Sequence, residues 1–150
     1  MSSLVSQLTK TYINFEDWHG EEKLSQEEAD KYHEKLLGQG SIITVQDGYF
    51  LCGYTELWLI NYEQFGRIIC HERFSAMDED VVGGNVSYVA NVWVHPDYRD
   101  KGVLKLMRNR FFDKSKHCKF FVGQALRKKT QPVKVFKVSD IHLKGENNGK

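Results

Sequence analysis

Apolar and polar side chains follow their clearest pattern between Ser87 and Phe112. Residues 87–94 are rich in β-branched and aromatic side chains, which predicts a buried or half-buried central strand. Pro96 ends this strand, because proline has no N–H for the ladder and favours extended geometry in the residue before it. From Val103 the apolar residues recur at helical spacing, with mostly basic residues on the other side. The pattern therefore predicts a strand, a tight turn, a glycine and a helix.

Further elements are predicted on both sides of this unit. Ser25 and Glu28 have the form of a capping box, which starts a helix at about Gln26, and Gly38 ends that helix. The other predicted elements are strands at 41–45, 49–60, 68–70, 120–126 and 133–138, and an exposed acidic loop at 75–84. The first two of these strands form an antiparallel hairpin. Strand 120–126 lies parallel to the central strand, because a helix joins the two.

This order of elements predicts a single domain over residues 1–150. Its class is α/β (α+β), with a mixed, mostly antiparallel central sheet that is flanked by helices and holds a parallel pair at its centre. A chain of 150 residues is long enough to bury its own core. An apolar content of 41%, with 13% aromatic residues, is typical of a folded protein.

Charge divides the chain into two unlike halves, although the net charge is only +1. Residues 101–150 hold 14 Lys or Arg against 3 Asp or Glu, whereas residues 1–100 hold 7 against 17. One interpretation is that the basic half meets an anion, either a phosphorylated cofactor or a nucleic acid. The other is that the two halves neutralise each other across the fold.

Cysteine usage and hydropathy point to the compartment. Cys52, Cys70 and Cys118 are odd in number and widely spaced, which is typical of free thiols in a reducing environment. No apolar run approaches the roughly 20 residues that cross a bilayer. The first ten residues lack the basic and apolar regions of a signal peptide. We therefore expect a cytoplasmic protein that does not enter a membrane.

The turn after the central strand has the chemistry of an anion site. A glycine at the mouth of a helix lets several backbone N–H groups point at one anion, and Arg99 and Lys101 add positive charge. The run Val92-Trp93-Val94-His95-Pro96, followed by Tyr98-Arg99-Asp100-Lys101-Gly102-Val103, resembles the central motif of the GNAT superfamily of N-acetyltransferases. The resemblance implies an acyl-CoA N-acyltransferase-like fold and transfer of an acetyl group from acetyl-CoA to an amine.

The same resemblance implies which residues bind the cofactor. In the family this strand edge pairs with the pantetheine arm of acetyl-CoA, which implies backbone contacts from Val92 and Val94. The family's glycine turn holds the pyrophosphate, a role that falls here on Arg99, Asp100, Lys101, Gly102, Val103 and Leu104. The chain departs from the family pattern at Leu104, where the family has glycine or alanine.

As a layout the resemblance covers roughly residues 26–126, and its specific residues lie at about 92–104. After the second parallel strand the family usually adds a helix and a β-hairpin, whereas residues 127–131 are too short for a normal helix. The chain thus resembles a short, C-terminally trimmed member, such as those encoded by some bacterial viruses. The segment after the second parallel strand, which would form the acceptor side of the site, is the part least like the family.

Acyl transfer to an amine needs a base for the amine and polarisation of the thioester carbonyl, and an acid assists the leaving thiolate. Glu56 is the best candidate base, because its apolar neighbours on strand 49–60 would raise its pKa. The alternative is that Glu56 faces solvent from the polar side of an antiparallel strand. Asn91 is a candidate for orienting the acceptor, with a hydrogen-bonded structural role as the alternative.

The acid is not determined by the sequence. The family often uses a tyrosine after the second parallel strand, but the last tyrosine of this chain is Tyr98. Tyr88 on the central strand is the candidate we retain, and Ser139 and His142 are two others. The missing tyrosine and Leu104 favour an alternative function, namely a catalytically inactive relative with a structural or partner-binding role.

Two further features of the sequence bear on metal and nucleic-acid sites. Neither Cys70-His71 nor His117-Cys118 has the ligand spacing of structural zinc, so no metal site is predicted. The basic run Arg127-Lys128-Lys129 favours nucleic acid, by salt-sensitive phosphate contacts. The alternatives are that these basic residues bind the 3′-phosphate of CoA or that they form a solvated surface. Neither the amine acceptor, a small molecule or a protein, nor the oligomeric state follows from the sequence.

Overall fold

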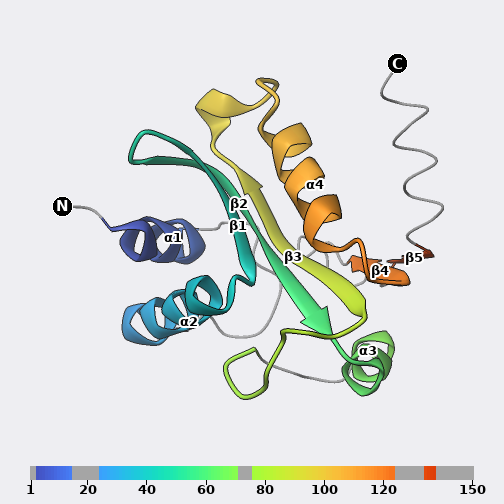
Figure 1. Ribbon diagram of the computed structural model, residues 1–150. Coiled ribbons are helices and arrows are strands. Elements are labelled where there is room, and N and C mark those ends of the chain that lie inside the picture. The colour runs from blue at the N-terminus through green and yellow to red at the C-terminus, as the bar shows by residue number, and fades with distance from the viewer. Residues whose placement is uncertain (1–2, 15–23, 71–75, 124–133, 138–150) are drawn as a thin grey trace.

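The computed structural model describes residues 3–14, 24–70, 76–123 and 134–137, the last four as backbone only (Figure 1). The first half contains α1 (Leu4–Ile13), α2 (Gln26–Gln39), β1 (Ile42–Asp47), β2 (Phe50–Ile60) and α3 (Tyr62–Ile69). The second half contains β3 (Val86–Val94), the short 3₁₀ helix η1 (Pro96–Tyr98), α4 (Val103–Lys114), β4 (Phe120–Gly123) and β5 (Lys134–Lys137).

The five strands form one sheet in the order β1-β2-β3-β4-β5. β3 and β4 pair in parallel, from Val86 opposite Phe120 to Val89 opposite Gly123. The other neighbours are antiparallel. This confirms the mixed, mostly antiparallel sheet with a parallel pair inside it. Residues 124–126, which the sequence assigns to the second parallel strand, lie outside the described residues.

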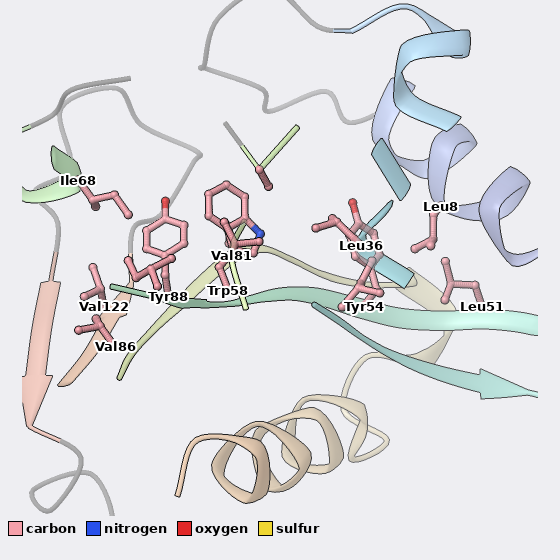
Figure 2. Close-up of a cluster of buried hydrophobic side chains, with 14 residues drawn as sticks. Leu8, Leu36, Leu51, Tyr54, Trp58, Ile68, Val81, Val86, Tyr88 and Val122 are labelled. Atoms are coloured by element: carbon pink, nitrogen blue, oxygen red, sulfur yellow. The ribbon is translucent and has the colours of Figure 1, made fainter. Parts of the chain in front are cut away.

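Helices cover both faces of the sheet. α1 and α2 lie on one side and α4 on the other (Figure 1). On the α1–α2 side, Leu8 and Leu36 pack over Tyr54, Trp58 and other buried side chains of β2 and β3, and Figure 2 shows this cluster with α4 beyond the strands. On the α4 side a second cluster is made by Val103, Met107, Phe111, Ile43, Val45, Cys52 and Leu57.

Because both faces are covered, β2 is buried along nearly its whole length, with Phe50 exposed and Leu59 half-buried. Polar positions on this strand therefore cannot face water, as they would in a sheet with one solvated side. Glu56 is only 1% exposed. The alternative that Glu56 lies on a solvent-facing side of its strand is wrong for this reason.

Two side chains of α4 also reach the outer edge of the sheet at β1. The Arg110 guanidinium donates to the backbone oxygen of Thr44 at 2.6 Å. Lys114 Nζ donates to the backbone oxygen of Gly40 at 3.0 Å. Two cations of one helix thus occupy carbonyl groups on or beside an edge strand of the described sheet.

Two local predictions are corrected. The strand predicted at 68–70 is the last turn of α3 and its C-cap. Asn61 caps this helix in a capping box with Gln64, and that signal outweighs three consecutive apolar residues. The helix of the first half does not end at Gly38 but at Gln39, where Gly40 takes the left-handed conformation (φ 72°) of a helix C-cap.

Candidate active site

The candidate site begins where β3 loses its regular pairing. On one side, β4 accompanies β3 only as far as Val89, and the described residues include no strand that pairs with 90–94 on that side. On the other side the register with β2 shifts, so that Asn91 and Val92 together face Thr55. Asn91 has a positive φ of 54°. This is a β-bulge, a feature that re-aims side chains beside a strand.

Glu56 lies next to this bulge and collects three hydrogen bonds. Its Oε1 accepts from the Tyr32 hydroxyl and from the Trp58 indole N–H, the latter at 3.1 Å. Its Oε2 accepts from the Asn91 amide N–H. Burial raises the pKa of the Glu56 carboxyl, and the three hydrogen bonds partly oppose that rise because they favour the charged form. Within the described ranges, no Lys, Arg or His forms an ion pair with Glu56.

Tyrosines surround the buried carboxylate. Burial, together with the charge of Glu56, raises the pKa of Tyr32 and Tyr54, and it raises the pKa of Tyr88 to about 12. Tyr88 itself is 7% exposed and packs on Trp58, with 5.1 Å between ring centroids (Figure 2). The structure thus brings Glu56 and Asn91 into contact, whereas Tyr88 lies in the adjacent core without a hydrogen bond to either.

The predicted glycine turn is present at the end of β3. Asp100 and Gly102 both have positive φ, of 63° and 84°, on either side of Lys101. The first hydrogen bond within α4 runs from the Leu106 N–H to the Gly102 oxygen, so the N–H groups of residues 103–105 come before it. Gly102, the N-cap residue, supplies no side-chain cap. Three backbone donors and the helix dipole therefore face out of this end of the helix.

Side chains around the turn differ in exposure. Val92 and Leu104 are exposed, at 44% and 59%, and Val94 is half-buried. Val103 is buried against the sheet, so only its backbone can contribute to an anion site. The Arg99 Nε donates to the Val94 oxygen at 3.4 Å, and Lys101 Nζ lies 5.7 Å from the centre of the Tyr98 ring.

The tip of the β1–β2 hairpin supports this turn. The Phe50 ring stacks on Tyr98, with centroids 5.8 Å apart, and meets His95 edge-on at 5.0 Å. His95 Nδ1 accepts from the Asp97 N–H at 3.1 Å, which confirms its prediction as a turn residue. The two contacts of Phe50 join residues more than forty positions apart, and no local pattern in the sequence predicts them.

Tyr32 and Trp58 are the site residues that sequence reasoning missed. Tyr32 falls on the apolar side of the helix that begins at Gln26, which predicts only that it points inwards. Its contact with Glu56 depends on how α2 packs on the sheet. Trp58 lies two positions after Glu56, so alternation along a strand places both on one face, but it does not predict the hydrogen bond.

The remaining predictions concern metal ligands, cysteines and the basic run. Among the described residues no group of three or more His, Cys, Asp or Glu is placed to hold a metal ion. The three cysteines are free thiols, with Cys52 and Cys118 buried. Arg127, Lys128 and Lys129, and with them the nucleic-acid prediction, lie outside the described residues, as do Ser139 and His142.

No helix in the described parts of the chain has both the length and the apolar character needed to cross a membrane.

The sheet order, the bulged β3 and the glycine turn into α4 together define the fold of the GNAT acyl-CoA N-acyltransferases. Solved structures confirm this fold. The chain is similar to the GNAT-like decarboxylase GphF in complex with isobutyryl-CoA, with TM-score 0.58 and 13% identity over 82% of this chain and 62% of that one. It is also similar to a predicted acetyltransferase from Clostridium acetobutylicum with acetyl-CoA, with TM-score 0.52 and 14% identity over 83% of this chain and 74% of that one.

A third similar structure is diaminobutyrate acetyltransferase EctA from Paenibacillus lautus, in complex with L-2,4-diaminobutyric acid and coenzyme A. Its TM-score is 0.50, and the identity is 10% over 81% of this chain and 59% of that one. The chain therefore spans less than two thirds of the length of two of these three proteins. No protein-family model and no curated protein sequence matches it.

Proposed function

We propose that this protein is an N-acetyltransferase that moves an acetyl group from acetyl-CoA to an amine. The observation that carries the proposal is that one strand, β3, links the two features of the candidate site. β3 holds a bulge at Asn91 that is hydrogen-bonded to the buried Glu56, and the same strand leads into the glycine turn before α4. β3 thus connects the carboxylate of Glu56, on the neighbouring strand β2, with a turn whose backbone N–H groups can face an anion, and this supports transfer from a CoA thioester.

The residues at the turn fit the pyrophosphate of a CoA cofactor. A Cβ built on Gly102 would meet no atom within 4 Å, so the space in front of the helix is open there. The N–H groups of Val103 and Leu104 are backbone donors, and the exposed Leu104 side chain does not remove them. Arg99, Asp100 and Lys101 complete the loop that we propose to hold the pyrophosphate. Structures of similar fold are solved with acetyl-CoA or isobutyryl-CoA, which supports the assignment.

The remaining steps fall to side chains and backbone of β2 and β3. Acetyl-CoA would supply a thioester carbonyl, which the acceptor nitrogen attacks. We assign backbone contacts with the pantetheine to Val92 and Val94, whose strand edge lacks a described partner on the β4 side. Glu56 takes the amine proton, because its raised pKa makes it a stronger base than an exposed carboxylate. Asn91 orients both Glu56 and the acceptor from the half-buried bulge.

For the proton that assists the leaving thiolate we propose Tyr88. Its pKa, raised to about 12 by burial and by the charge of Glu56, keeps its hydroxyl protonated at neutral pH. A Tyr88→Phe variant should then lower kcat without weakening CoA binding. An amine acceptor is in keeping with EctA, which is solved with a diamino acid.

The second candidate is a structural or partner-binding role without catalysis, in which Glu56 serves only to hold the fold together. Its supporting observation is that hydrogen bonds from α2, β2 and β3 converge on Glu56 and tie these elements together. The two candidates differ in cofactor binding and turnover, because a purely structural role for Glu56 requires neither of them.

The test is calorimetric titration of the purified protein with acetyl-CoA and, separately, with CoA at near-physiological salt. We expect binding in the micromolar range, and a Gly102→Trp variant should bind at least about tenfold more weakly, since the indole fills the space in front of α4. Gly83→Trp is the matched control: Gly83 also has a positive φ (78°) and open space around a built Cβ, but it lies in the loop before β3. Absence of heat, together with no thermal stabilisation at millimolar ligand, would overturn the enzyme proposal.

A further inference from the structure

The hydrogen bonds to Glu56 are unevenly divided between its two oxygens. Oε1 accepts two, from the Tyr32 hydroxyl and the Trp58 indole N–H. Oε2 accepts one, from the Asn91 amide. An ionised carboxylate has about four lone-pair sites, two on each oxygen. Within the described residues, Oε1 is therefore saturated and Oε2 retains one unused lone pair.

The donors to Oε1 hold the carboxylate in one orientation. Tyr32 belongs to α2 and Trp58 to β2, so the two donors come from different elements that pack against each other. Trp58 is 8% exposed, and the raised pKa of Tyr32 keeps its hydroxyl a donor at all ordinary pH values. Rotation of the carboxylate would break both bonds to Oε1 in a place where water cannot replace them. Oε2 thus points to the bulge of β3.

We propose that Tyr32 and Trp58 are positioning residues that make Oε2 of Glu56 the only oxygen able to take a proton. This deepens the proposed function and rests on it where it concerns the acceptor. An acceptor amine has to approach from beside Asn91, which donates to Oε2 and is half-buried, whereas Glu56 itself is buried. One amine N–H bond breaks as an O–H bond forms at Oε2. The nitrogen electron pair forms the C–N bond, and the C–S pair leaves with sulfur, which gains a proton from Tyr88 or water.

The test measures ionisation of Glu56 directly and needs neither cofactor nor acceptor. Infrared spectra of the full chain recorded against pH follow the carboxyl C=O stretch, and the Glu56 band is the one that Glu56→Gln removes. Tyr32→Phe and Trp58→Phe each delete one donor to Oε1 and keep an aromatic ring. Each should lower the acid dissociation constant of Glu56 by about tenfold, because a hydrogen bond to the charged form is lost.

Tyr54→Phe is the matched control, since it removes a hydroxyl from another buried tyrosine that faces Glu56 without hydrogen-bonding to it. Its effect on the Glu56 band should be much smaller. Equal titration midpoints of the Glu56 carboxyl band in wild type, Tyr32→Phe and Trp58→Phe would overturn the proposal. So would a shift in Tyr54→Phe as large as in the other two, because the effect would then come from general packing.

The positioning and the enzyme proposals can fail separately. Tyr32→Phe should bind acetyl-CoA as wild type does, because α2, which carries Tyr32, lies on the opposite side of the sheet from α4 and its glycine turn. Once an acceptor amine is known, the variant should also lower kcat at neutral pH and move the acidic limb of the pH profile upwards, with the KM for acetyl-CoA unchanged. If wild type binds no acetyl-CoA while the titration midpoints shift as expected, the enzyme proposal fails and the positioning of Oε2 stands. A pH profile that does not move in Tyr32→Phe would overturn the positioning role.

Discussion

The Tyr98 hydroxyl donates a 3.0 Å hydrogen bond to Oδ2 of Asp47, from the turn before α4 to the end of β1. The two residues are 51 positions apart in the chain. Through this bond, and through the Phe50 ring that stacks on Tyr98, the hairpin between β1 and β2 holds the loop that we propose to bind pyrophosphate. The anion site therefore depends on a hairpin that does not itself touch the anion.

This pair yields the first prediction. The hydrogen bond to Asp47, and then desolvation, raise the pKa of Tyr98 to about 12. Asp47→Ala should return that pKa towards 10, its value in an unperturbed tyrosine. A tyrosine titration followed by NMR checks this, with the Tyr98 signal assigned by Tyr98→Phe.

Tyr98→Phe should also weaken CoA binding by roughly threefold to tenfold, the range expected for loss of one modest hydrogen bond. Tyr49→Phe serves as the control for CoA binding, because the Tyr49 side chain is 89% exposed on the same hairpin. Equal affinities in Tyr98→Phe and Tyr49→Phe would show that the hairpin does not support the anion site.

The second prediction concerns the buried His33, whose Nδ1 lies 3.0 Å from the Thr9 hydroxyl between α1 and α2. Burial lowers the pKa of His33 to about 4, whereas a histidine in the unfolded chain titrates near 6.5. The unfolded chain therefore binds more protons between these values, and stability is lost as the pH falls from about 6.5 towards 4.

The contribution is roughly 1–3 kcal/mol. It is measured as the difference in unfolding free energy between wild type and His33→Gln, by urea denaturation at several pH values. A difference that stays constant from pH 7 to pH 4 would contradict the prediction.

Glu56 gives a third prediction of the opposite sign. Burial raises its pKa in the folded protein, so the folded state binds the proton more tightly than the unfolded chain does. Its contribution to stability is full below the unfolded pKa and is lost as the pH rises through the folded pKa. Glu56→Gln should therefore lose less stability than wild type between pH 4.5 and pH 8, as measured by urea midpoints. Parallel pH curves for the two proteins would refute this.

Gly53 supports the fourth prediction. A Cβ at this position of β2 would lie 2.7 Å from Cγ1 of Val103 and 3.0 Å from the Trp93 oxygen, so the Val103 side chain at the start of α4 or the strands beneath it must shift. Gly53→Ala should cost about 1–3 kcal/mol of unfolding free energy, the usual range for overpacking.

Gly66→Ala is the matched control. Gly66 lies exposed within α3, and a Cβ there meets nothing within 4 Å. Because alanine favours a helix over glycine, this change should raise stability by up to about 1 kcal/mol. If both variants unfold at the same urea concentration, the close approach of α4 to β2 is not as described.

Local signals predicted the parts of this fold that are encoded locally. The capping box at Ser25, the β1–β2 hairpin and the passage from strand through Gly102 into a helix all follow from neighbouring residues, and all are present. α3 was missed because Ile68, Ile69 and Cys70 form an apolar run that suits a strand equally well. The neighbours of Glu56 left burial and exposure to solvent as two alternatives, and helices on both faces of the sheet decide for burial. Its partner Tyr32 lies 24 positions away on another element. The bulge at Asn91 has only one local signal, the tolerance of asparagine for positive φ.

The contacts that Arg110 and Lys114 make with the carbonyl groups of Thr44 and Gly40 have a consequence for the protein in a crowded solution. An open strand edge is a template on which another chain can add a strand, and long runs of such additions end as aggregates. Here the edge carries positive charge, the Thr44 carbonyl of β1 is already engaged, and so is the Gly40 carbonyl just before the strand. The helix that we propose to present the cofactor's anion site therefore also protects the sheet from growing at β1.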